Sequence, residues 1–317
     1  MTAVSEGRPT PPRAPVLYIA GTGRSGSTLL ARLLGVHDGF LAVGELRYLW
    51  ERGLAANHLC GCRAPFRSCP FWDEVLTRAF GGMEQAEKLD VPRLALAVDR
   101  VRHVPSLMVE GLRPAPFRRL LADYGSILSS LYASILEVAR GSVVVDSSKD
   151  ASYAFVLDAV DGLDVSFVHL VRDSRAVAHS WTRRRHRPEI HWTTEHMLQR
   201  PAVRSGFKWN QHQALVEALR LTRSRFTRLR YEDLVDDTDA SIARLAALTV
   251  PAASSPPFAQ GRAPFPHNIS GNPIRFAQPA PVLADDEWRT ALGLRDRRAV
   301  TLVTAPLLLR YGYLHKR

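Results

Sequence analysis

Short apolar runs alternate along this chain with longer stretches in which apolar positions recur every three or four residues. Helical patterns of this second kind lie at about 151–160, 174–183, 206–223 and 239–248. Five short runs rich in strand-forming residues lie at 16–20, 40–43, 142–145, 165–171 and 226–231. Strands that alternate with helices predict an α/β fold of the doubly wound type, a mainly parallel sheet with helices on both faces.

The chain of 317 residues has room for two domains or for one large one. Residues 1–14, where several prolines interrupt polar positions, predict a flexible leader. We expect residues 15–317 to form a single domain, with a mostly helical insertion at about 46–141. In doubly wound sheets ligands bind beyond the carboxyl ends of the strands. We expect the insertion to lie over that crevice.

Targeting signals and net charge restrict the cellular location and the class of partner that the sequence predicts. The first ten residues lack a charged region followed by an apolar one, and the longest apolar stretch, 300–309, is broken by Thr and Pro. Three cysteines are too few for a disulfide framework in a chain of this length, which fits a reducing compartment. We therefore expect a cytoplasmic protein, and we expect no membrane span. Lys plus Arg exceed Asp plus Glu by 42 − 31 = 11, which indicates an anionic partner: nucleic acid, a phosphate-rich ligand or an anionic surface.

A glycine-rich loop follows the first predicted strand. Residues 21–28, Gly-Thr-Gly-Arg-Ser-Gly-Ser-Thr, match the P-loop pattern G-x-x-x-x-G-K-[ST] except that Ser27 replaces the lysine. Successive backbone N–H groups and a helix N-terminus in such a loop bind an anion. Without the lysine that contacts the β- and γ-phosphates, a nucleoside triphosphatase is disfavoured. Arg24 supplies positive charge from within the loop.

This loop resembles that of the sulfotransferases that use 3′-phosphoadenosine-5′-phosphosulfate (PAPS), whose fold is similar to a P-loop nucleotide kinase. The family string R-S-G-[ST]-[ST]-L-L matches the loop, and the block V-R-D-x-R-x4-S matches residues 171–180. The late family loop over the nucleotide resembles residues 267–275. The motif pattern is most similar to the tyrosylprotein and carbohydrate branch and its bacterial relatives.

The resemblance implies a set of nucleotide-binding residues. The loop would hold the 5′ end, and Arg172 with Ser180 would hold the 3′-phosphate. Tyr231 matches a family tyrosine near the nucleotide, with core filling as the alternative. The implied set is Gly23, Arg24, Ser25, Gly26, Ser27, Thr28, Arg172, Ser180, Tyr231 and Arg275.

The resemblance also implies catalytic residues. Glu45, in a Gly-Glu pair after the first helix, is similar to the base of the sulfotransferases that act on protein tyrosine, and we expect partial burial to raise its pKa. The alternative is a glutamate that only pairs with Arg24 or Arg47. Lys149, after the third strand, would stabilise the transferred group together with Arg24.

Two family features are absent. The cytosolic small-molecule branch uses a Lys-x-His pair near the position of Lys149, but here Ala151 stands where the histidine would be. A family serine precedes a Lys-Trp pair, but before Lys208 the chain has Phe207. Ser205 or Ser148 would have to replace this donor.

The sequence thus predicts a sulfotransferase that moves a sulfuryl group from PAPS to a hydroxyl-bearing small metabolite, saccharide or lipid headgroup, without a required metal. The alternatives are a P-loop nucleotide kinase or triphosphatase, which needs Mg²⁺ and ATP, and a nucleic-acid-binding protein. Aromatic residues of the insertion are candidate walls of the acceptor pocket: Tyr48, Trp50, Phe66 and Trp72.

Two further clusters have several interpretations. Four potential zinc ligands lie close in sequence, but C-x-C is tighter than the usual C-x2-C, which favours reduced thiols over zinc, or over a disulfide from Cys69 to Cys60 or Cys62. The fourth of these ligands is His58. A basic run at 183–187 favours steering of an anionic substrate over nucleic-acid binding.

Overall fold

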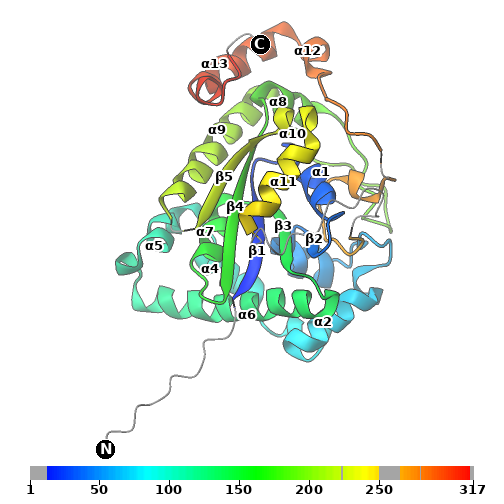
Figure 1. Ribbon diagram of the computed structural model, residues 1–317, viewed down its shortest axis with the longest axis vertical. Helices are drawn as coiled ribbons and strands as arrows, with labels where there is room; N and C mark the ends of the chain where they lie inside the picture. Colours follow the sequence, from blue (N-terminus) through cyan, green and yellow to red (C-terminus); the bar gives the residue numbers. More distant parts are fainter. Residues whose placement is uncertain (1–12, 223, 250–264, 279, 315–317) are drawn as a thin grey trace, which may run out of the picture.

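Five parallel strands form one sheet in the order β2-β3-β1-β4-β5 in the computed structural model (Figure 1), which describes residues 13–222, 224–249, 265–278 and 280–314. The predicted doubly wound α/β fold is confirmed. Most of the predicted leader lies outside the described residues, and the first strand already begins at Ala14. The strands are β1 (Ala14–Gly21), β2 (Phe40–Gly44), β3 (Val143–Lys149), β4 (Leu163–Val171) and β5 (Arg225–Arg230).

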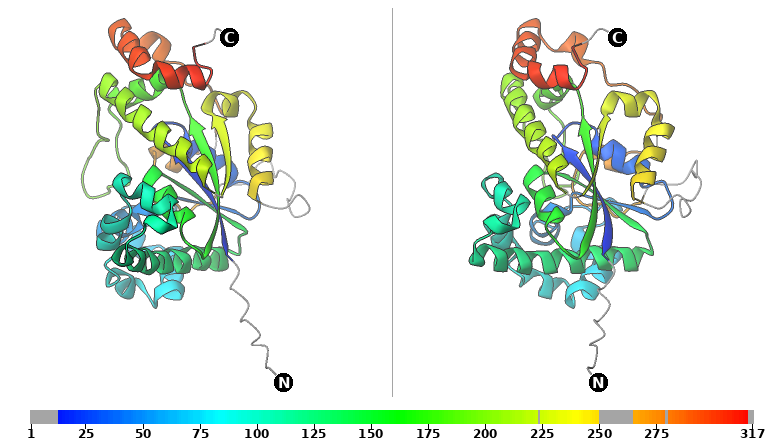
Figure 2. Two further views of the ribbon diagram at one scale, coloured as in Figure 1. Left: turned by 90° about the vertical axis from the view of Figure 1, so that its left-hand side faces the viewer. Right: turned by 60° about the vertical axis from the view of Figure 1, so that its left-hand side comes forward.

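Helices cover both faces of the sheet (Figure 2). Alternation along β1 directs Leu17 and Ile19 to one face, where they pack with α1 (Ser27–Leu34) and α11 (Thr238–Thr249). Val16 and Tyr18 face the opposite side and join a larger core. The helices of that second side are α6 (Ala115–Ala139), α7 (Ala151–Asp158) and α9 (Ala202–Ala218).

Residues 46–141 contain several helices, but most of this segment does not cover the crevice. Only Tyr48 and Arg52 of residues 46–141 line the main cavity. The long helix α6 instead runs along the amino-terminal edge of the sheet, beside the start of β1 (Figure 1), because its apolar face is buried in the larger core. The other helices of the insertion are α2 (Pro70–Phe80), α3 (Met83–Glu87), α4 (Val91–Val98) and α5 (Val104–Met108).

The C-terminal part adds helices above the carboxyl ends of the strands. The apolar stretch at 300–309 belongs to α13 (Leu294–Arg310), which packs on α9 and buries Val300 and Leu308. Within the described residues, no helix combines the length and apolar character needed to cross a membrane. The remaining helices are α8 (Ser174–Thr182), α10 (Tyr231–Asp236) and α12 (Trp288–Ala291).

Candidate functional site

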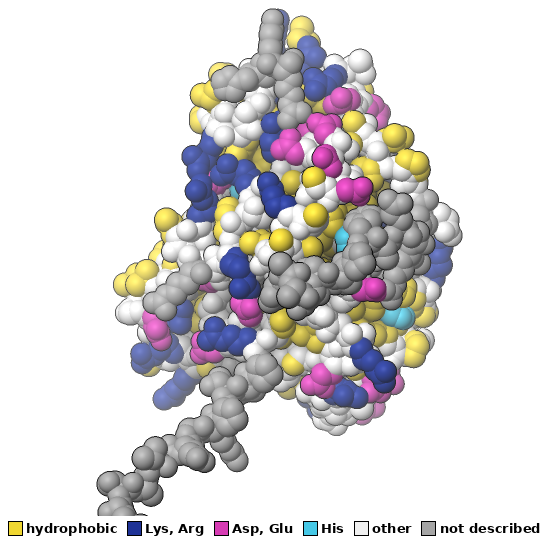
Figure 3. Space-filling view, viewed as in Figure 1, with side chains coloured by type: hydrophobic (Ala, Val, Ile, Leu, Met, Phe, Trp, Pro, Cys, Tyr) yellow, Lys and Arg dark blue, Asp and Glu magenta, His cyan; other side chains and the backbone are white. Residues whose placement is uncertain are grey.

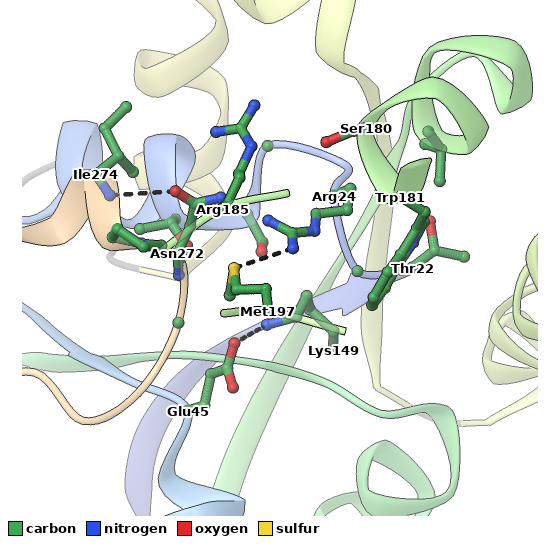
Figure 4. Close-up of a pocket in the computed structure, with 18 of the residues that line it drawn as sticks. Thr22, Arg24, Glu45, Lys149, Ser180, Trp181, Arg185, Met197, Asn272 and Ile274 are labelled. Carbon is green, nitrogen blue, oxygen red and sulfur yellow. Dashed lines mark hydrogen bonds and ion pairs between the residues drawn. The ribbon is translucent and has the colours of Figure 1, made fainter. Parts of the chain in front are cut away.

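The three central strands end at one large cavity. The glycine-rich loop follows β1, Lys149 ends β3, and Arg172 follows β4. Because β1 lies between β3 and β4, their carboxyl ends meet, and the cavity there has a volume of about 1080 Å³. Figure 4 shows Arg24 and Lys149 both directed into it. The loop and Arg172 therefore lie on the same side of the molecule, as a shared ligand requires.

The backbone of the loop depends on glycine at its tightest point. Gly26 has φ +95°, a conformation that L side chains rarely adopt. A Cβ atom there would lie 2.5 Å from the ring of Tyr231, so the tyrosine packs directly against the loop. Within the described chain, the hydroxyl oxygens of Thr22 and Ser25 are buried and have no hydrogen-bond partner. Ser25, although part of the loop, is fully buried and does not line the cavity.

Arg24 brings a positive charge into the cavity. Its guanidinium stacks over the ring of Trp181 at 5.0 Å and donates to the sulfur of Met197 at 3.0 Å. Burial and the neighbouring Arg185 lower the pKa of Arg24 to about 10, so it remains protonated at neutral pH. Its Nη1 atom is buried without a partner in the described chain. This nitrogen is available to an anionic ligand.

Arg172 is a second arginine of the cavity, in addition to Arg24. It is 5% exposed, stacks over Tyr231 at 4.3 Å and donates to the backbone oxygen of Arg24 at 3.3 Å. Its Nη2 atom lies 3.0 Å from a carboxylate oxygen of Asp285, and its Nε atom has no partner among the described residues. Ser180, the other predicted ligand of the 3′-phosphate, lines the same cavity. The carboxylate of Asp285 therefore occupies a position next to Arg172 that an anionic ligand would compete for.

Glu45 is buried and held by cations. Lys149 donates to its Oε1 atom, Arg52 lies 3.4 Å from Oε2, and Ser270 donates to Oε2 at 3.0 Å. Burial alone would raise the pKa of Glu45, but the charges and hydrogen bonds of these neighbours outweigh it and leave the pKa below its usual value. The expectation of a raised pKa is therefore wrong for this state. Arg47, a predicted partner of Glu45, pairs instead with Asp99 at 2.6 Å.

Arg275 does not reach the cavity. The residue is 7% exposed, and its guanidinium donates to the backbone oxygens of Asn268 and Leu59, both at 2.8 Å. This placement contradicts the predicted phosphate contact, because the side chain is used to hold its own loop in place. The loop itself does approach the glycine-rich loop, since the backbone N–H of Asn272 donates to the hydroxyl of Thr28 at 3.2 Å.

Residues 185–200 and α9 form the opposite wall, where the sequence predicts the insertion. Tyr48 lines the cavity as predicted, but Trp50, Phe66 and Trp72 lie in the large core. Sequence reasoning missed several lining residues of α8 and of the opposite wall, although the basic run at 183–187 pointed to this part of the chain. The missed residues are Trp181, Met197, Arg200, Lys208 and His212.

Ser205 lies in the cavity near the position where the family motif has a serine and this chain has Phe207. Phe207 is 61% exposed and does not line the cavity. Ser205, two positions earlier on α9, does line it, and its buried hydroxyl has no partner within the described residues. Ser148, the other candidate, already donates to Asp146 at 2.5 Å. Ser205 is therefore the better placed of the two.

The cavity has a surplus of positive charge. Eight Lys or Arg residues and four Asp or Glu residues line it, a difference of 8 − 4 = 4. On the outer face in Figure 3, by contrast, basic and acidic side chains are interspersed. The eight cationic residues are Arg24, Arg52, Lys149, Arg172, Arg185, Arg187, Arg200 and Lys208. This concentration suits a small ligand with several negative charges.

Comparisons with known proteins agree with this geometry. Residues 15–250 match the model of a sulfotransferase family. The sulfotransferase domain of the Synechococcus PCC 7002 olefin synthase is 21% identical, with a TM-score of 0.51 over 98% of each chain. At this identity the likeness establishes a common fold.

Two other solved structures are more distant. The sulfotransferase domain from the curacin biosynthetic pathway is 18% identical, with a TM-score of 0.47, over 92% of this chain and 98% of its own. Sulfotransferase STF9 from Mycobacterium avium is 14% identical, with a TM-score of 0.46, over 95% of this chain and 77% of its own. The search of curated proteins gives no match.

Proposed function

The chain belongs to the sulfotransferase family, and from this premise we propose that it transfers a sulfuryl group from PAPS to a hydroxyl-bearing acceptor. The observation that carries the proposal is the set of buried, unpartnered polar atoms on Arg24 and Arg172, two arginines that line one cationic cavity. Within the described chain these donors have no partner, which is costly, and an anionic ligand would satisfy them.

The donor would bind across the ends of β1 and β4. Backbone N–H groups of the loop, the N-terminus of α1 and Arg24 would hold the 5′-phosphosulfate. Arg172, kept in place by Tyr231, and Ser180 would hold the 3′-phosphate. Asp285 would have to leave Arg172 when the nucleotide binds, because both would use the same guanidinium.

The transfer would use Glu45 as base. The acceptor oxygen forms a bond to sulfur while the bond from sulfur to the bridging phosphate oxygen breaks, and the acceptor proton passes to Glu45. Lys149 and Arg24 would stabilise the charge that develops on the bridging oxygen. In the free protein Lys149 neutralises Glu45. A bound phosphosulfate would draw Lys149 away and so raise the pKa of Glu45 toward that of an effective base.

The acceptor would enter between Tyr48 and α9. Ser205 and Lys208 would add donors on that side. The hydroxyl of Tyr48 donates to Asp150 at 3.0 Å, which holds this side chain in the cavity wall. A small metabolite, a saccharide or a lipid headgroup would each present a suitable hydroxyl. We further infer a cytoplasmic setting, supported by the three free thiols.

The donor assignment is tested by nucleotide binding. We expect 3′-phosphoadenosine 5′-phosphate (PAP) to raise the melting temperature without Mg²⁺, and more than ATP with Mg²⁺ does. Arg172→Ala should weaken PAP by about 30-fold, or about 2 kcal/mol, through loss of charge-assisted hydrogen bonds. AMP, which lacks the 3′-phosphate, should lose little. Isothermal titration calorimetry measures both affinities.

The exposed Arg204, outside the cavity, provides the matched control, and Arg204→Ala should leave PAP binding unchanged. Stronger stabilisation by ATP with Mg²⁺ would favour a kinase. An equal loss of PAP and AMP affinity in Arg172→Ala would remove the 3′-phosphate assignment. Transfer of labelled sulfate from PAPS to a panel of hydroxyl compounds then tests the reaction itself.

A further inference from the structure

Four metal-ligating side chains converge away from the cavity. None of them lines it, and their ligand atoms all lie within 4.8 Å of one another. Two of the four side chains are buried and two are half-buried. We call this group, which consists of Cys60, Cys62, Cys69 and His267, the thiol–imidazole cluster.

The distances within the cluster fit a single small ion. The sulfur of Cys69 lies 3.7 Å from that of Cys62 and 3.8 Å from that of Cys60. Two sulfurs that bind one tetrahedral zinc, each at about 2.3 Å, are about 3.8 Å apart. The Nδ1 atom of His267 completes the group, 3.3 Å from Cys69 and 4.0 Å from Cys60.

Backbone donors also prepare the sulfurs for a metal. The N–H groups of Cys62 and Ala64 donate to the sulfurs of Cys60 and Cys62, and that of Trp72 donates to Cys69. Such bonds stabilise thiolates, the form in which cysteine binds metals. A disulfide between two of the cysteines would not explain why the third thiol and the imidazole also lie at the same point.

We propose that the thiol–imidazole cluster binds one structural zinc ion. Three thiolates and one imidazole are a common ligand set for zinc, and four protein ligands leave no open position for a substrate. The three thiols lose their protons on binding. The ion is separate from the proposed transfer reaction. The sequence pattern suggested His58 as the fourth ligand, but its ring lies against Trp192 at 5.6 Å.

The ion would join two segments that are far apart in sequence. His267 follows Cys69 by 198 residues. Beside it, the N–H of Gly61 donates to Asn268 at 2.9 Å, and the next residues pair with the end of β2. One position further, Ser270 donates to Glu45. Zinc would therefore fix the loop that positions the proposed base.

Metal analysis of the full-length protein tests the proposal. Protein purified with a phosphine reductant and without chelator should contain about one zinc per chain. Cys69→Ser should reduce the content to below about a tenth of that value, because a thiolate ligand is lost. His58→Ala is the matched control and should keep the zinc.

Cobalt substitution gives a reading that does not depend on a variant folding. Wild-type protein loaded with Co²⁺ should show the thiolate charge-transfer band and the intense visible bands of tetrahedral cobalt. Zinc-free protein with three reactive thiols, an intramolecular disulfide, or cobalt spectra without thiolate bands would each overturn the proposal. Because metal content is measured apart from activity, these results leave the assignment of the transfer reaction untouched.

Discussion

At the scale of single residues, Glu45 holds its charge through its neighbours. Its position after the first helix was predictable from the Gly-Glu pair, but its pKa was not. The sign of the pKa shift depends on Lys149 and Arg52, and Lys149 lies 104 residues from Glu45 along the chain and meets it only in the fold. The sequence predicts the burial of Glu45, whereas the compensating cations depend on the tertiary structure.

Replacement of Glu45 by glutamine tests its role as base. We expect Glu45→Gln to lower kcat by about 10²-fold or more, because the amide cannot accept the acceptor proton. PAP binding should change little, since Arg24 and Arg172 remain. Steady-state kinetics with PAPS and calorimetry with PAP measure the two effects.

The exposed Glu51 supplies the control, and Glu51→Gln should leave kcat unchanged. Since Lys149, Arg52 and Ser270 lower the pKa of Glu45 below its usual value, the free enzyme should keep this carboxylate ionised at neutral pH, with no loss of kcat/KM from this group there. Unchanged turnover in Glu45→Gln would exclude Glu45 as the base.

Asp285 competes for Arg172 in the free protein. We expect Asp285→Asn to bind PAP several-fold more tightly, because the nucleotide no longer has to displace a carboxylate from the guanidinium. The neighbouring Asp286, which forms an ion pair with Arg289, is the control. Calorimetry measures both variants. Weaker PAP binding by Asp285→Asn, or equal effects of the two substitutions, would show that the Asp285 pair does not oppose the ligand.

At the scale of elements, the strands followed from short apolar runs. The five predicted runs and the observed strands agree to within a few residues. A buried parallel strand needs a continuous apolar stretch, whereas the edge strand β5 is only partly buried and has a mixed sequence. The helix α13 was not predicted. Arginines interrupt its apolar positions and Pro306 lies within it, so its pattern is weak without α9 as a partner.

The sequence also did not predict where the insertion lies relative to the sheet. Its helical pattern was evident, but the side that it covers depends on which face of the sheet the other helices leave free. Trp72, fully buried in the core, is for this reason a wrong prediction of a pocket wall. Apolar residues identify burial and do not say whether the buried surface faces a ligand or a neighbouring helix.

The junction between the loop and α1 has a testable requirement for glycine. Gly26→Ala should destabilise the protein by about 1 kcal/mol or more, because its backbone φ is positive and the added Cβ meets Tyr231. PAP affinity should fall as well, since Tyr231 supports Arg172. Thermal unfolding and calorimetry report the two losses.

Gly111 is a suitable control, because a Cβ there meets nothing within 4 Å. Gly111→Ala should leave both the melting temperature and PAP affinity close to those of the wild type. If Gly26→Ala also left both quantities unchanged, the close packing of Tyr231 on the loop would contribute neither to stability nor to PAP binding.

At the scale of the whole molecule, the surplus of basic residues indicates an anionic partner from composition alone. The fold gathers part of that surplus around one cavity, as the motifs suggest. Composition does not distinguish a nucleotide from nucleic acid, since both attract basic residues. The distinction rests on where Arg24 and Arg172 lie relative to each other.

The pairing of Ile269 with the end of β2 indicates that residues beyond the family match contribute to the site. Ile269 exchanges backbone hydrogen bonds with Val43 and Glu45, at 2.8 and 2.7 Å, although the family match ends at residue 250. A protein truncated at that boundary would retain all five strands yet lose Ser270 beside Glu45. We therefore expect a protein truncated at residue 250 to lose a hydrogen bond that holds the proposed base in place, and with it any transfer that depends on Glu45.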